Sequence, residues 1–390
     1  MTPIEKTDVS RERPSGVMLS LSKQSETCAF SRPDFQVRLS RGRNPGLQQV
    51  PEERISSAEA LELFSSDLPE LGALADRRRR RAVPRERVGY IVDRIINYSN
   101  RCAAGCDFCA FHAEAGVVPP YDLSTEEILE KVHALEAGGG SQVMLQGGLH
   151  PDHDLEWYVT LLRTVKRECP AMWLHSFSPA EVVHLADREG VSYGDVIKAM
   201  KAAGLDSMPG ASDILVDDVR QRVSPRKCSR DQWRAVMVAL KENDMVSSAT
   251  LTYGMGESLE QRVEHLRFVR ETQDETGVFQ AFIPWSFSPS RTRLDHIAPA
   301  SGPDYLRTVA ISRIMLDNIP HIQAGWLTEG AELAQIALCM GADDMGGVLT
   351  EELVVQAAGV TTRLTAADME DLIRNAGKIP VRRDSRYRPV

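Results

Sequence analysis

The chain has 390 residues, of which 42% are hydrophobic and 26% are charged, and its formal net charge is −9 at pH 7. This balance predicts a soluble globular protein of one large or two ordinary domains and argues against phosphates as the main ligands. No apolar run reaches the ~20 residues of a membrane span, and the N-terminus lacks the pattern of a secretion signal. We therefore expect a cytoplasmic protein without membrane or nucleic-acid partners.

Residues 1–54 are rich in Ser, Arg, Pro and Gln and have no sustained apolar period, which predicts a disordered extension. Helical patterning starts near Ser57, so we expect a helical segment over residues 55–86. This segment contains the basic run Arg77–Arg81. Such a run is more typical of a solvated helix end than of a nucleic-acid patch.

From Gly89 onward, short apolar or β-branched runs alternate with amphipathic segments of ten or more residues. The expected strands are residues 89–98, 141–146, 172–177, 205–209, 247–254, 278–285, 321–326 and a weaker 342–347. Strands that alternate with helices pair in parallel through right-handed crossovers. Eight such units predict an α/β fold, a (β/α)8 TIM-type barrel over residues 87–375, followed by a C-terminal tail over 376–390. Active sites of such barrels lie at the carboxyl ends of the strands.

Three of the seven cysteines, Cys102, Cys106 and Cys109, follow the first expected strand with the spacing C-x3-C-x2-C. Closely spaced thiolates favour zinc or an iron–sulfur cluster. With His112, the loop also matches a closed Cys3His site of a zinc-stabilised binding module, and unligated thiols are a third reading. Against zinc, four ligands within eleven residues form an unusually tight knuckle at the mouth of a barrel. The other cysteines are scattered singly, unlike a disulfide framework.

The cysteine spacing, with Phe108 before the last thiol, resembles the signature of the radical S-adenosylmethionine (SAM) superfamily. Two further stretches match it in order and strand placement, namely Gln146-Gly147-Gly148 after the second expected strand and YGMGE, residues 253–257, after the fifth. The resemblance implies a [4Fe–4S] cluster on three cysteines whose open iron binds SAM. One electron, from a donor such as flavodoxin or ferredoxin, would then release a 5′-deoxyadenosyl radical.

Longer stretches within residues 57–360 resemble the branch that contains the futalosine-pathway menaquinone enzymes and the deazaflavin-forming enzyme. They include INYSNRCAAGCDFCAF, LHSFSPAEV and GADDMGGVLTEELVVQAAG. Pro284-Trp285 after QAFI is most similar to the cyclic dehypoxanthine futalosine synthases. That likeness implies the small-molecule substrate dehypoxanthine futalosine, hydrogen abstraction from its ribose C4′ and addition of the sugar radical to its benzoate ring. A reaction of the aminofutalosine synthase or deazaflavin synthase type is the alternative.

The loop after the fourth expected strand departs from the resembled pattern. That pattern is PGGGAEIL, whereas residues 209–215 read PGASDIL, which is one residue shorter and has Asp213 in place of glutamate. Because the side chain of Asp213 is shorter than that of glutamate, its contact is lost unless the backbone moves to restore it. This difference bears on the identity of the substrate and leaves the radical chemistry untouched.

The resemblance and the strand positions together nominate the site residues. The expected metal ligands are Cys102, Cys106 and Cys109, and the expected cofactor contacts are Phe108, Gln146, Gly147, Gly148, Ser178, Asp213, Gly254, Glu257 and Ile283. The expected substrate contacts are His175, Ser176, Arg291 and Gln323, with Arg291 as the partner of the benzoate carboxylate. The ring proton needs a general base, which we expect among His175, Asp213 and Tyr253. The alternative interpretations give these residues structural roles only, in turns that end strands, in helix caps or, for Arg291, as a solvated loop arginine.

Overall fold

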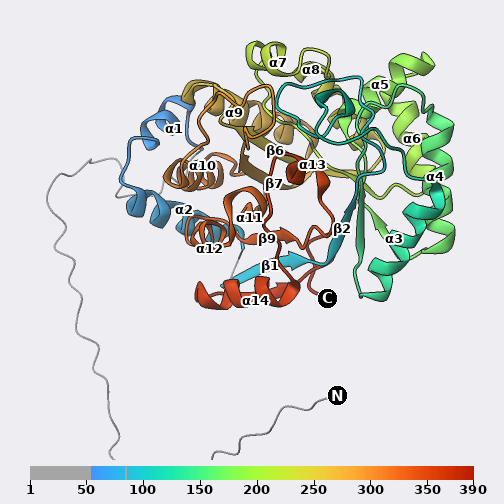
Figure 1. Ribbon diagram of the computed structural model, residues 1–390. Helices are drawn as coiled ribbons and strands as arrows, with labels where there is room; N and C mark the ends of the chain where they lie inside the picture. Colours follow the sequence, from blue (N-terminus) through green and yellow to red (C-terminus); the bar gives the residue numbers. More distant parts are fainter. Residues whose placement is uncertain (1–53, 84–85) are drawn as a thin grey trace, which may run out of the picture. The chain divides into compact units, whose positions relative to one another are not determined.

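The computed structural model describes residues 54–83 and 86–390 (Figure 1). Apart from Arg54, the extension expected over residues 1–54 lies outside this part of the chain. The described residues begin with two helices, α1 (Ser57–Leu63) and α2 (Leu68–Ala82), of which α2 packs on α10 (Gly302–Met315). The helix α1 starts with a capping box of Ser56 and Glu59, which satisfies free amide groups at the helix start.

The strands pair in parallel in the order of a barrel. They are β1 (Arg87–Ile91), β2 (Asp93–Ile96), β3 (Gln142–Leu145), β4 (Trp173–Leu174), β5 (Ser207–Met208), β6 (Val246–Tyr253), β7 (Phe279–Ser286), β8 (His321–Ile322) and β9 (Asp344–Gly347). The ladders are β2-β3-β4, β5-β6-β7-β8 and β1-β9. Single bridges, His175 to Ser207 and Gln323 to Asp344, join the ladders. A bridge of Arg94 on β2 to Thr350, which follows β9, links the last ladder to the first. The predicted α/β fold with parallel strands is confirmed, and this strand order is consistent with the predicted (β/α)8 barrel.

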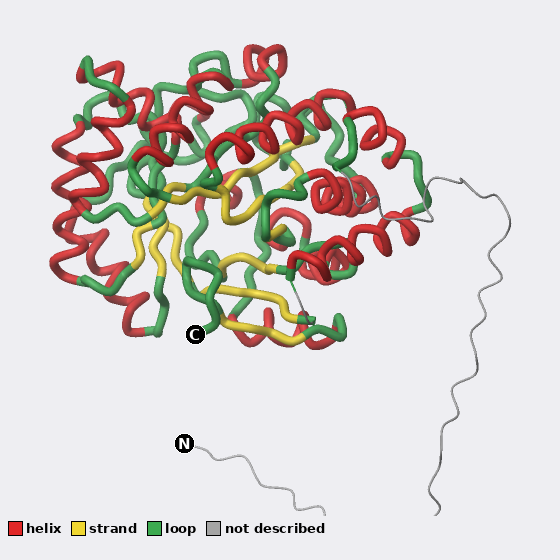
Figure 2. The backbone as a smooth tube through the Cα atoms, turned by 180° about the vertical axis from the view of Figure 1, so that it is seen from behind, coloured by secondary structure: helices red, strands yellow, loops and turns green. Residues whose placement is uncertain are grey.

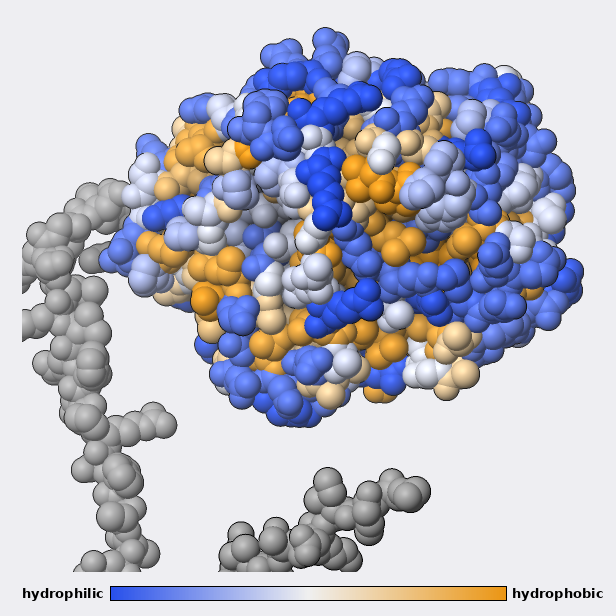
Figure 3. All heavy atoms as spheres, viewed as in Figure 1, coloured by the Kyte–Doolittle hydropathy of each residue, from blue (hydrophilic) through white to orange (hydrophobic). Residues whose placement is uncertain are grey.

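Helices lie around the outside of these strands (Figures 1 and 2). Besides α10, they are α3 (Thr125–Ala137), α4 (Leu155–Glu168), α5 (Pro179–Glu189), α6 (Tyr193–Ala203), α7 (Asp217–Val223), α8 (Arg230–Glu242), α9 (Leu259–Thr276), α11 (Trp326–Glu329), α12 (Ala331–Ala337), α13 (Leu353–Ala357) and α14 (Ala366–Asn375). The helix α4 buries one stripe, with Tyr158, Leu162 and Val165 at helical spacing, whereas α10 is buried on most sides. On the face in Figure 3, hydrophilic residues dominate the periphery and hydrophobic ones gather towards the middle.

The first strand and the C-terminus differ from expectation. The expected strand 89–98 is broken at Val92 into β1 and β2, which pair with different neighbours. The expected tail contains a strand, β10 (Ile379–Arg382), which pairs in parallel with the free edge of β1. Residues 383–390 continue from this strand, so the C-terminal segment is part of the barrel. No helix in the described residues has the length and apolar character needed to cross a bilayer.

Candidate active site

A cavity of about 460 Å³ runs along the inside of the barrel beneath the cysteine loop. Its wall contains first residues of strands, such as Gln142 and Ser207, as well as residues that follow strands, such as Gln146 and Gly148. Of the residues nominated from the sequence, twelve lie in the wall: Cys102, Cys106, Phe108, Cys109, Gln146, Gly147, Gly148, His175, Ser178, Asp213, Ile283 and Gln323. The barrel therefore brings together residues from six separate strand ends or strands.

The cysteine loop packs directly on the loop after β3. The amide of Cys109 donates to the carbonyl of Cys106 at 3.1 Å, and the amide of Leu149 donates to Sγ of Cys102 at 3.3 Å. Gly148 has φ +88°, and a Cβ atom there would lie 2.8 Å from Sγ of Cys102. Glycine is thus required by both the backbone conformation and the close approach of the thiol.

The donor set of the loop bears on the two metal interpretations. Zinc bonds of ~2.3 Å put two thiolate sulfurs of one tetrahedral site ~3.8 Å apart. Among the residues that the structure describes, the group whose ligand atoms all lie within 4.8 Å of one another is elsewhere, at His133, Glu136 and Cys169. The loop thiols and His112 do not form such a group. Three thiols on one loop are the donor set of an iron–sulfur cluster, in which each thiolate binds a different iron.

A buried ion pair lies beside the loop. Nζ of Lys227 is 2.6 Å from the Asp213 carboxylate and 5.9 Å from the centre of the Phe108 ring. Burial opposes a charge on Lys227, but the negative charge of Asp213 outweighs it and raises the lysine pKa. Burial raises the pKa of the Cys106 thiol to about 12 despite Lys227, so a thiolate there needs further positive charge, such as a metal centre.

The shortened loop bends sharply to make this ion pair. Ala211 and Asp213 both have positive φ, +40° and +48°, which is the region that favours glycine. The carbonyl of Asp213 accepts the amide of Thr252 on β6 at 2.9 Å, which anchors the loop. The aspartate thus reaches the cavity through an unusual backbone conformation in place of a longer side chain.

Glu181 lies in the cavity wall and was missed in the sequence, where its place three residues after Ser178 suggests only a helix cap. It accepts the hydroxyl of Ser178 at 2.7 Å and that of Tyr98 at 2.8 Å. Burial raises its pKa to about 7, although both hydrogen bonds act in the opposite direction. This carboxyl group is therefore able to change protonation near neutral pH.

His175 lies in the cavity wall. Its Nδ1 lies 2.7 Å from the hydroxyl of Ser207, which also accepts the indole N–H of Trp173 at 2.8 Å. Burial, followed by the positive charge of Arg383, lowers the pKa of His175 to about 3. The imidazole is therefore neutral at physiological pH, and Nε2 is its remaining polar atom.

The C-terminal segment supplies the floor of the cavity, which the sequence did not predict. Arg383, Ser385 and Tyr387 all lie in the wall. Two guanidinium nitrogens of Arg383 bind the carboxylate of Asp344 at 2.5 and 2.9 Å. Tyr387 covers this guanidinium at 3.8 Å and accepts the side-chain amide of Gln323 at 2.7 Å. The tail is thus held in place by a buried ion pair and an aromatic stack.

Two more buried carboxyl groups in the wall were not predicted. Asp93 accepts the amide of Leu349 at 2.9 Å, and Glu352 accepts the amide of Val354 at 2.6 Å. Burial raises the pKa of Asp93 to about 6 and that of Glu352 to about 7. Asp93 fits only because position 347 is glycine, where a Cβ atom would lie 2.1 Å from its carboxylate.

Five nominated residues do not line this cavity, and their expected roles stay predictions: Ser176, Tyr253, Gly254, Glu257 and Arg291. The Ser176 hydroxyl accepts the amide of Leu145 at 3.0 Å within the sheet. Arg291 is exposed on a loop.

The turn after β6 holds three of these residues in contacts of its own. Glu257 accepts the amides of Gly254 and Met255, each at 2.8 Å, and pairs with Arg262 at 2.8 Å. The buried ring of Tyr253 packs on the Arg262 guanidinium at 4.3 Å. These contacts stabilise the turn.

Comparisons with known proteins identify the family of the chain. Residues 96–269 match the radical SAM superfamily, and residues 276–390 match the CofH/MqnC C-terminal region. The chain is 41% and 40% identical to the cyclic dehypoxanthine futalosine synthases of Halalkalibacterium halodurans and Streptomyces coelicolor, over 86% of its length and 91% and 85% of theirs. It is also 37% identical to the 5-amino-6-(D-ribitylamino)uracil–L-tyrosine 4-hydroxyphenyl transferase of Methanococcoides burtonii, over 85% of its length and 95% of that protein.

Two solved structures share the fold. Methylornithine synthase (PylB) has a TM-score of 0.66 at 18% identity, over 85% of this chain and 96% of that one. The hydrogenase maturase HydG of Carboxydothermus hydrogenoformans has a TM-score of 0.70 at 16% identity, over 88% and 80%. The relatives named above are more than 35% identical to this chain over most of its length. They therefore show which family the chain belongs to. The protein is an enzyme of the radical SAM superfamily and belongs to its CofH/MqnC group.

Proposed function

We propose that the protein converts dehypoxanthine futalosine to cyclic dehypoxanthine futalosine in menaquinone biosynthesis. The observation that carries this proposal is the 40–41% identity to two cyclic dehypoxanthine futalosine synthases along most of both chains. The Pro284-Trp285 pair at the end of β7, which resembles the same enzymes, supports it, and Trp285 lies in the cavity wall. A flavodoxin or ferredoxin is the expected electron donor.

Cys102, Cys106 and Cys109 would hold a [4Fe–4S] cluster, and the backbone of Gln146–Gly148 would lie against bound SAM. When bound, this pair of cofactors supplies a 5′-deoxyadenosyl radical, which takes a hydrogen atom from carbon. The protein orients the substrate and keeps water away from the radical. A wall with the apolar side chains of Ile95, Phe177 and Ile283 suits that task.

The proposed cyclisation removes two hydrogens from the substrate. The first leaves ribose C4′ as a hydrogen atom, and a bond forms between C4′ and a carbon of the benzoate ring. The ring then loses one electron, to a one-electron acceptor, and one proton. Asp93 and Glu352 are the favoured proton acceptors because their pKa values, about 6 and about 7, lie near the working pH. His175 is a weaker base, since its pKa is about 3.

The test is anaerobic turnover of the reconstituted protein with SAM, a reductant and dehypoxanthine futalosine, followed by mass spectrometry. A product two hydrogens lighter than the substrate, formed together with 5′-deoxyadenosine, is the expected result. Cys106→Ala should abolish both products, whereas Cys339→Ser, which changes an exposed thiol, should retain them.

A parallel reaction with 5-amino-6-(D-ribitylamino)uracil and L-tyrosine tests the transferase activity named for the relative in Methanococcoides burtonii. Product formation there, without conversion of dehypoxanthine futalosine, would overturn the proposed substrate. The radical SAM assignment would survive that result.

A further inference from the structure

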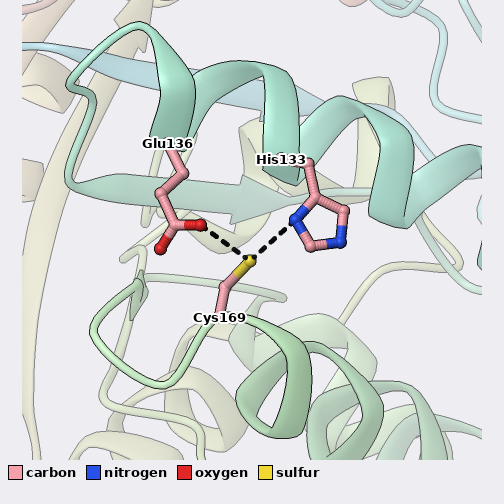
Figure 4. A group of neighbouring side chains, drawn as sticks. All are labelled: His133, Glu136 and Cys169. Carbon is pink, nitrogen blue, oxygen red and sulfur yellow. Dashed lines mark hydrogen bonds between the residues drawn. The ribbon is translucent and has the colours of Figure 1, made fainter.

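Three metal-binding side chains meet at the amino-terminal end of the barrel, away from the cysteine loop. His133 and Glu136 lie on α3, and Cys169 is the C-cap residue of α4 (Figure 4). Both helices lead directly into strands, α3 into β3 and α4 into β4. In such barrels this end contributes to stability, while chemistry takes place at the other end.

The distances match those of one tetrahedral ion. Sγ of Cys169 lies 3.4 Å from Nδ1 of His133 and 3.5 Å from a carboxylate oxygen of Glu136. All three ligand atoms lie within 4.8 Å of one another. Zinc bonds of ~2.3 Å to sulfur and ~2.0 Å to nitrogen or oxygen place such ligands ~3.5 Å apart in a tetrahedral site. The side chains therefore need little movement to surround an ion.

The helix geometry and the local charge favour a cation. His133 and Glu136 are three residues apart and so share one face of α3. The carboxylate of Glu136 adds negative charge beside the sulfur. His133 and Glu136 are exposed, which leaves a route for the ion.

We propose that His133, Glu136 and Cys169 form a zinc site with water as the fourth ligand. A thiolate and an imidazole exclude magnesium and calcium, which prefer oxygen ligands. The ion would fasten the end of α3 to the end of α4 at the base of two adjacent strands. Its role is structural, since α3 and α4 meet it at the amino-terminal end of the barrel.

The experiment uses the anaerobically reconstituted enzyme, so that the loop thiols are already occupied, and zinc chloride as the probe. Bound zinc is measured after gel filtration, and its affinity is measured by competition with a chromophoric chelator. The wild type should retain one zinc per chain and unfold at a higher temperature with zinc than without it. His133→Ala and Cys169→Ser should each weaken zinc binding at least tenfold, while Cys339→Ser should match the wild type.

Cobalt gives a second readout that does not depend on turnover. Bound Co²⁺ should produce a thiolate-to-cobalt absorption band that Cys169→Ser removes and Cys339→Ser retains. Equal zinc binding by the wild type and both site variants, or a zinc stoichiometry of zero, would overturn the proposal. Because His133 is exposed, its replacement should fold and keep the test valid.

Discussion

Replacing Lys227 by methionine tests the electrostatics beside the cysteine loop. Nζ of Lys227 is 2.6 Å from Asp213, and the two side chains are only 16% and 13% exposed. Removing one partner of a buried pair leaves an uncompensated charge, which costs about 3–5 kcal/mol. Arg220 remains 3.9 Å from Asp213 and offsets part of that cost. We therefore expect Lys227→Met to lower the free energy of unfolding by about 3 kcal/mol.

The assay is urea unfolding of the reduced apoprotein at pH 7, followed by far-ultraviolet circular dichroism. A double variant, Asp213→Asn with Lys227→Met, should regain most of the loss because it removes both charges. Lys198→Met, on an exposed face of α6, is the matched control and should stay within about 0.5 kcal/mol of the wild type. A loss below ~1 kcal/mol for Lys227→Met, or no recovery in the double variant, would refute this reasoning.

Three further outcomes follow from the described contacts. Gly148→Ala should lower the iron content of reconstituted protein more than Gly190→Ala, since both have positive φ but only position 148 would press a Cβ onto a loop thiol. Arg383→Met should destabilise the protein by about 3–5 kcal/mol in urea unfolding, and Asp344→Asn should rescue it, because their pair is buried. The raised pKa of Glu352, about 7 against an ordinary 4.5, stabilises the fold below pH 4.5, and this stabilisation is lost as the pH rises through 7. Glu352→Gln should thus gain up to ~3 kcal/mol relative to the wild type between pH 4.5 and 8 in the same assay, and a constant difference would contradict the assignment.

Alternation of apolar runs with amphipathic segments was enough to predict the barrel, because each βα unit carries its own local pattern. The same pattern overestimated strand lengths, since β4, β5 and β8 contain two residues each. It also missed the break at Val92 and the strand β10. Both depend on pairing between distant parts of the chain, as in the register of Arg87 with Ile379. Such pairing leaves no periodicity in a four-residue segment that contains a proline.

Sequence patterns predicted those parts of the site in which neighbouring residues follow one strand. The cysteine loop, the glycines after β3 and Asp213 all follow strands, and all lie in the cavity wall. Asp93 was overlooked because it lies at the start of β2 and not at a strand end. Arg383 was overlooked because its role requires Asp344, 39 residues earlier in the chain. Tyr253 does not line the cavity, and period-two alternation alone does not say which face of a strand turns towards it.

The two matched regions contribute different residues to the cavity wall. This difference predicts which residues select the substrate. Residues 96–269 contribute the cysteine loop, whereas residues 276–390 contribute Gln323, Glu352 and the floor around Arg383. Relatives named for different reactions are 41% and 37% identical to this chain, so the family includes more than one substrate. Under the proposed function, we therefore expect Gln323→Ala to lower turnover of the proposed substrate, dehypoxanthine futalosine, at least tenfold while 5′-deoxyadenosine still forms without substrate conversion. Equal loss of both products, as expected for Cys106→Ala, would instead make the floor part of the radical machinery.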